Sequence, residues 1–183
     1  MGMGISIVDR EKFLSFVVDG NQEQMDFYLM NSCQGGASFD DIRFMVDNGA
    51  NPLANNSKAF CYACGIEDVS VAQYFIYHHR VDLNSFGEEA MSCALSNKRR
   101  EICKLLMDNG VEITDENIKS VANGISVDAF NILLELGIDP ERIAKIFMKY
   151  NFYGNILTIL KLFIENNVDL NQTVLDIAKT KLN

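Results

Sequence analysis

Two cysteines and two histidines are the residues of this chain whose types best suit chemistry. Cys61 and Cys64 stand three positions apart, and His78 and His79 are the only histidines in the sequence. Two thiolates and two imidazoles could complete a tetrahedral zinc site. However, paired zinc-binding histidines are normally separated by about three to five residues, and a helix would place the two cysteines where buried thiols pack well. We therefore expect no metal and no cofactor at these residues.

Covalent catalysis has few candidate groups. Cys33 precedes a Gly35-Gly36 pair, and its thiol would be the nucleophile of a Cys/His-dependent enzyme. The two adjacent histidines are the only imidazole bases for such an enzyme, and Gly35-Gly36 lacks the strand and the Lys of a phosphate-binding loop. The Asp and Glu residues single out no catalytic carboxylate pair. We expect Cys33 to be an ordinary helix-end residue in a non-catalytic protein, and keep the Cys/His-dependent enzyme as an alternative.

The charge of the chain bears on its partners. The formal net charge is -9, and the 16 basic residues are scattered along the sequence. Proteins that bind nucleic acid cluster their basic residues to contact phosphates, so nucleic acid is not expected as a partner. The acidity suits a basic partner. The acidity also allows an alternative function, in which the protein mimics nucleic acid and so inhibits an enzyme that acts on nucleic acid.

The apolar stretches bear on location. The richest of them, residues 155–164, contains Lys161 and is too short to span a membrane. The first residues lack the charged start and the cleavage site of a secretory signal, which indicates a cytoplasmic protein with free thiols. Gly2 and Ser6 fit the minimal pattern for N-myristoylation, but no polybasic segment follows to complete a stable membrane anchor.

The elements that carry these residues are predicted to be helices. The chain has two prolines and shows no sustained alternation of apolar and polar residues, which favours an all-α fold. A buried helix end followed by a turn recurs five times, with the turn residues spaced by 31, 30, 27 and 30 positions. The five turn residues are Gly49, Arg80, Gly110, Gly137 and Asn167. Gly and Asn tolerate the left-handed conformation that closes a helix, so Arg80 is the exception.

Each interval between turns has room for two helices. Ala59 and Ala63, and then Ala90 and Ala94, are small residues spaced by four positions, which lets neighbouring helices approach closely. We predict a single domain of helical repeats with a cap at each end. The boundaries are an N-terminal cap at 1–20, repeats at 21–51, 52–82, 83–112, 113–139 and 140–169, and a C-terminal cap at 170–183.

The turn sequences resemble the end of the ankyrin repeat. They read Asp-Asn-Gly-Ala-Asn-Pro at 47–52, Asp-Asn-Gly-Val-Glu-Ile at 108–113 and Asn-Asn-Val-Asp-Leu-Asn at 166–171. The chain is similar to the divergent, Asn-rich and Ile-rich ankyrin repeats of giant DNA viruses, protists and intracellular bacteria, although the family's Thr-Pro-Leu-His start is nowhere intact. The resemblance implies an ankyrin-like solenoid of stacked helix-turn-helix repeats.

The resemblance also implies a function. Ankyrin-like stacks bind other proteins through the concave side that their first helices and turn tips form. Matching this chain to that pattern gives the candidate protein-binding residues Asn55, Asn56, Lys58, Tyr62, Phe86, Glu88 and Glu89. The protein is expected to be an interaction module that binds another protein, as a host-directed adaptor or inhibitor of a virus or an intracellular microbe. An apolar terminal edge would also permit self-association.

Overall fold

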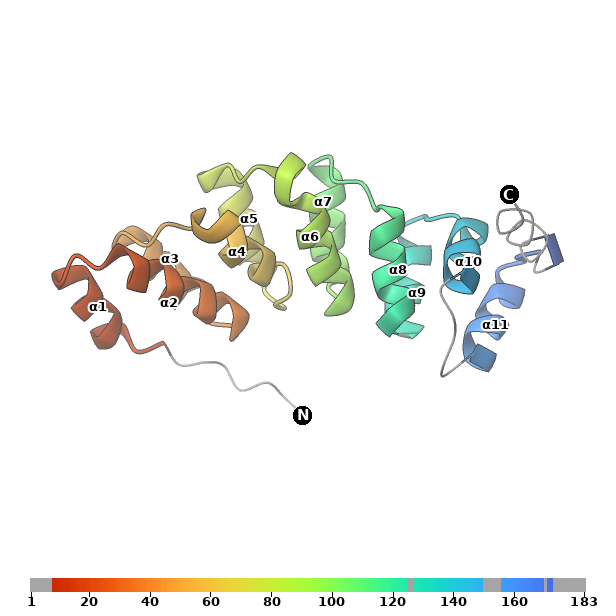
Figure 1. Ribbon diagram of the computed structural model, residues 1–183, viewed down its shortest axis with the longest axis horizontal. Coiled ribbons are helices and arrows are strands. Elements are labelled where there is room, and N and C mark those ends of the chain that lie inside the picture. The colour runs from red at the N-terminus through yellow and green to blue at the C-terminus, as the bar shows by residue number, and fades with distance from the viewer. Residues whose placement is uncertain (1–7, 125–126, 150–155, 170, 173–183) are drawn as a thin grey trace. The chain divides into compact units, whose positions relative to one another are not determined.

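The computed structural model describes residues 8–124, 127–149, 156–169 and 171–172 (Figure 1). Within these ranges the regular structure is helical and contains no strand, which confirms the all-α prediction. The chain divides into two compact units, Met1–Glu112 (unit 1) and Ile113–Asn183 (unit 2). The proposed acylation site at Gly2 and most of the predicted C-terminal cap lie outside the described residues. The single domain stays a prediction.

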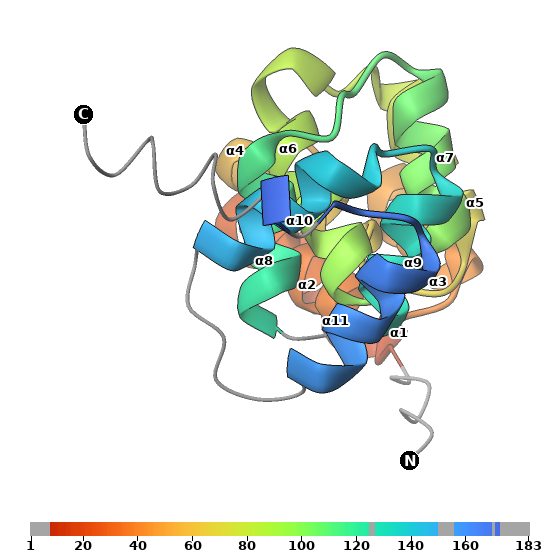
Figure 2. The same cartoon turned by 90° about the vertical axis from the view of Figure 1, so that its right-hand side faces the viewer.

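Unit 1 consists of paired helices in two layers. Its helices are α1 (Arg10–Val18), α2 (Gln22–Gln34), α3 (Phe39–Asp47), α4 (Ala54–Ala63), α5 (Val69–His79), α6 (Leu83–Ser96) and α7 (Arg100–Asp108). The inner helices α2, α4 and α6 pack on one another, while α3, α5 and α7 form an outer row. Figure 2 shows α4 and α6 on one side of this unit and α5 and α7 on the other. Each pair of one inner and one outer helix is a repeat of the stack.

Unit 2 continues the same kind of helix pair. It contains α8 (Asp115–Gly124), α9 (Val127–Glu135), α10 (Pro140–Lys149) and α11 (Ile156–Glu165). The buried rings of Phe130, Phe147 and Phe163 form its core. The centroid of the Phe130 ring lies 5.6 Å from that of Phe147 and 5.3 Å from that of Phe163. Arg142 links α10 to the start of α8 through bonds to Asp115 Oδ1 and to the carbonyl of Ile113, at 2.6 and 3.0 Å. Aromatic packing and this arginine therefore hold the second unit together.

Left-handed residues close the outer helices, as the sequence predicts. The φ angles at the five turn sites are 105° for Gly49, 49° for Arg80, 88° for Gly110, 80° for Gly137 and 57° for Asn167. A left-handed residue at this place lets the chain turn back and bond the last carbonyls of the helix. Arg80 takes this conformation although its Cβ disfavours it. The chain therefore forms the left-handed turn of the repeat at Arg80, although arginine does not favour this conformation.

The small residues of the inner helices are buried between repeats. Ala59, Ala63, Ala90 and Ala94 are each at most 3% exposed. Because their side chains are short, α4 and α6 can pack closely along their length. The predicted role of these alanines is confirmed.

The inner helix α4 begins in an unexpected way. Asn55, Asn56 and Ser57 all have left-handed backbone angles, with φ of 51°, 57° and 55°. Asn tolerates this region better than most other residues with a side chain, whereas Ser has no such preference for it. The right-handed part of α4 therefore starts after Ser57, and Asn55 and Asn56 form an exposed tip before it.

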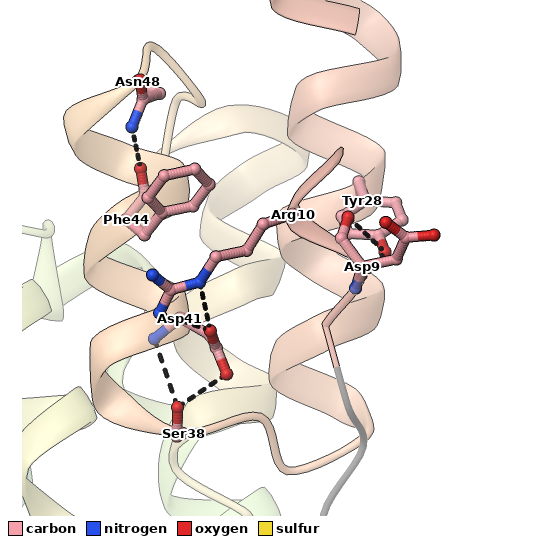
Figure 3. Close-up of polar contacts among 7 residues, drawn as sticks. All are labelled: Asp9, Arg10, Tyr28, Ser38, Asp41, Phe44 and Asn48. Atoms are coloured by element: carbon pink, nitrogen blue, oxygen red, sulfur yellow. Dashed lines mark hydrogen bonds and ion pairs between the residues drawn. The ribbon is translucent and has the colours of Figure 1, made fainter. Parts of the chain in front are cut away.

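The helix α1 caps unit 1 by packing on the first repeat. Arg10 Nε donates to Asp41 Oδ1 of α3 at 2.8 Å, and its guanidinium lies 4.6 Å from the centre of the Phe44 ring (Figure 3). The Asp9 amide donates to the Tyr28 hydroxyl of α2. Burial alone would raise the pKa of Asp41, but hydrogen bonds from Ser38 and Arg10 outweigh it and lower the pKa. These contacts attach the predicted N-terminal cap to α2 and α3.

Candidate functional site

The inner helices of unit 1 present equivalent residues at intervals of 31 positions. Phe27 of α2, Lys58 of α4 and Glu89 of α6 share one such position and form what we call the inner row. The register follows from the fully buried side chains two positions later, which are Leu29, Phe60 and Met91. Residues two apart on a helix point about 200° apart around its axis, so the inner row faces away from the core.

An ion pair shows that the inner row is continuous from one repeat to the next. Lys58 Nζ on α4 bonds Glu89 Oε1 on α6, and the two side chains remain 38% and 45% exposed. The hydrogen bond to Glu89 raises the pKa of Lys58. Exposed pairs of this kind contribute about 0–1 kcal/mol to stability. The pair therefore does little to hold the fold and lies on the surface.

Phe27 is the large apolar residue of this surface. Its side chain is 50% exposed, in the middle of a helix whose neighbours Met25 and Leu29 are buried. Phe27 is absent from the predicted binding residues, because residues 21–51 were predicted only as the first repeat. The interval of 31 positions to Lys58 was the signal that would have found it. An exposed aromatic side chain on a rigid helix is typical of protein contacts.

A second row lies one helical turn after the inner row. It consists of Asn31 on α2, Tyr62 on α4 and Cys93 on α6, again at intervals of 31 positions. Asn31 is exposed, and Tyr62 and Cys93 are half-buried. The two rows together form a continuous face of α2, α4 and α6, which we call the inner face.

The repeated positions agree with a known family. Residues 29–117 match the family model for ankyrin repeats, in three copies. The chain is an ankyrin-repeat protein. Ankyrin repeats are protein-protein interaction modules, and the matched segment runs from α2 into α8. Searches of curated proteins and of solved structures found no match. None of the described helices is long and apolar enough to cross a membrane.

The residues predicted to bind a partner lie in two inner helices of this ankyrin-repeat protein. Lys58 and Tyr62 are on α4, while Phe86, Glu88 and Glu89 are on α6. Asn55 and Asn56 form the exposed tip before the right-handed part of α4. The structure joins Lys58 to Glu89 directly. Phe86 is half-buried, as is Tyr62, so each shares its surface between packing and solvent. Their part in binding stays a prediction.

Most of the thiols of the ankyrin repeats are buried. Cys33 lies in the last turn of α2 and is buried, which confirms that it is a helix-end residue. Burial raises its pKa far above the ordinary range, and it raises the pKa of Cys61 to about 12. Because the thiolate is the reactive form, a raised pKa disfavours reaction of either thiol as a nucleophile. Cys93 is the only one of the five cysteines that is not fully buried.

The two histidines end α5 in the outer row of helices. His78 is exposed, whereas the His79 ring lies 4.8 Å from the Tyr74 ring and its Nε2 atom is buried without a hydrogen-bond partner. Burial and the neighbouring His78 lower the pKa of His79. Among the described residues, no three His, Cys, Asp or Glu side chains form a group that could hold a metal ion.

Proposed function

We propose that this ankyrin-repeat protein binds another protein through the inner face of unit 1. The observation that carries the proposal is the exposed ring of Phe27, in line with the surface ion pair of Lys58 and Glu89. Exposed aromatic side chains anchor protein interfaces, because a partner removes them from water. The inner face therefore combines an apolar anchor with charged groups that can select a partner.

The scaffold around this face supports the proposal. Phe27, Lys58 and Tyr62 project from helices whose opposite sides are fully buried, as the zero exposure of Leu29 and Phe60 shows. A surface on packed helices loses little conformational entropy when it binds. The exposed tip at Asn55 and Asn56 would extend the contact beyond the helices. A module of this kind acts by binding its partner without chemical change, as an adaptor or an inhibitor.

The state of the cysteines supports a cytoplasmic location for this binding. All five are free thiols, and four of them are buried. Small proteins of oxidising compartments commonly use cysteines as disulfides, whereas cytosolic proteins keep them reduced. We therefore propose that the partner is met in the cytoplasm.

Affinity capture from a cell lysate tests the proposed face. Wild type would be compared with Phe27→Ser and with the control Tyr77→Ser, which removes an aromatic side chain of similar exposure, 57%, from the outer helix α5. Circular dichroism would confirm that all three are folded. We expect a stoichiometric partner that is lost with Phe27→Ser and kept with Tyr77→Ser. A partner lost only with Tyr77→Ser would move the binding site to the outer helices.

A further inference from the structure

We infer that the inner face binds a basic protein segment that carries an apolar side chain. This inference rests on the proposed function and names the chemistry of the partner. It comes from the scarcity of basic residues in the inner helices and from the position of Phe27 four residues after the exposed Glu23.

Basic residues are scarce in the inner helices of unit 1. The inner helices α2, α4 and α6 contain four acidic residues, Glu23, Asp26, Glu88 and Glu89, and one basic residue, Lys58. The other basic residues of unit 1 lie on α1, α3 and α7 or in the turns; they are Arg10, Lys12, Arg43, Arg80, Lys98, Arg99, Arg100 and Lys104. The inner helices therefore hold one cation among four acidic residues, whereas α3, α5 and α7 hold three basic residues among five acidic ones.

The single cation of the inner layer is neutralised in place. Lys58 bonds Glu89 across the α4–α6 contact, so it adds no net positive charge to the face. Glu23 stands four positions before Phe27 on α2 and is exposed. Residues four apart lie on the same side of a helix, so a carboxylate and an exposed ring adjoin there. The α2 end of the inner face thus offers negative charge next to an apolar surface.

A ligand must match both properties. An acidic segment would be repelled by Glu23, and an uncharged one would gain no electrostatic attraction from it. A segment with Lys or Arg beside a Leu, Ile, Met or Phe would place its cation near Glu23 and its apolar side chain against Phe27. Contacts between exposed charges weaken as salt screens them, so the affinity should fall with ionic strength.

A displayed library of random peptides, selected on the full chain, tests the inference. We expect the selected sequences to be rich in Lys and Arg and to carry an apolar residue. For one selected peptide, made synthetically and labelled, fluorescence anisotropy should show an affinity about tenfold lower with Phe27→Ser. Glu23→Gln should weaken binding less and reduce its dependence on salt. The control Tyr77→Ser should bind as wild type does.

A second readout locates the peptide without a variant. Cys93 is half-buried in the second row of the inner face, so a bound peptide should slow its reaction with a thiol reagent. Selection of acidic or uncharged peptides, or of none, would overturn the inference. So would equal affinity for Phe27→Ser and Tyr77→Ser. If the captured cellular partner still depends on Phe27 while the library yields no basic peptide, the proposed function stands and this inference fails.

Discussion

Gly87 of α6 lies directly against Val111, so that a Cβ atom at position 87 would stand 2.7 Å from Val111 Cγ2. Real Cβ atoms do not approach other atoms this closely, and Val111 is itself buried in the turn that follows α7. The residue after the repeat turn therefore packs onto the inner helix of the same repeat. A glycine in the middle of α6 makes room for it.

Gly87→Val should consequently destabilise unit 1. The added side chain overpacks a closed site, which typically costs about 1–3 kcal/mol. Urea unfolding followed by circular dichroism would measure the loss. The double variant Gly87→Val/Val111→Ala should recover part of it, because the alanine removes both Cγ atoms. Equal stability of wild type and Gly87→Val would show that α6 and the turn do not pack as described.

The left-handed turn sites give a pair of opposite predictions. Arg80→Gly should raise the free energy of unfolding by about 1 kcal/mol, because glycine adopts a φ of 49° without the clash that a Cβ causes. Gly110→Val, at a φ of 88°, should lower it by a larger amount. Both would be measured by denaturant unfolding at one pH. Destabilisation by Arg80→Gly would mean that the arginine side chain contributes a contact that outweighs its backbone strain.

The fold was predictable because its repeat depends on local chemistry. Gly49, Gly110 and Gly137 mark the turns in the sequence, and the same conformation at Arg80 follows from its place in the repeat. The left-handed start of α4 at 55–57 was not predictable, because no glycine marks it.

The candidate site was predicted in part. Lys58 and Glu89 were named from the resemblance to ankyrin repeats, and the structure shows that they form an ion pair. Phe27 was missed, because phenylalanine is normally buried and its exposure here depends on how α2 packs against its neighbours. The interval of 31 positions places Phe27 in the same row as Lys58 and Glu89, but only the structure shows that its side chain is exposed.

The environment of His79 predicts that the folded protein loses stability in acid. Burial and His78 lower its folded pKa, Asp47 opposes them, and the Tyr74 and Phe75 rings cover it. Above the ordinary histidine pKa of about 6.5 the ring is neutral in both states and has no effect. As the pH falls below that value, the unfolded chain takes up the proton first, so the folded state loses stability until the pH passes the folded pKa.

Thermal unfolding at a series of pH values would check this. His79→Gln should remove part of the decline in melting temperature below about pH 6.5, whereas the exposed His78→Gln should leave most of it. An identical decline in wild type and His79→Gln would assign the acid sensitivity to other groups.

The thiols give a prediction that separates a binding module from an enzyme. In native protein one thiol, Cys93, should react with a chromogenic disulfide reagent, since the other four cysteines are buried. Burial raises the pKa of all five thiols, so the accessibility of Cys93 and not its acidity sets it apart. Cys93→Ser should abolish the native reaction, and denaturant should release the remaining thiols. Fast reaction of Cys33 in the native Cys93→Ser variant would instead show an activated thiol, and would favour the Cys/His-dependent enzyme over the interaction module.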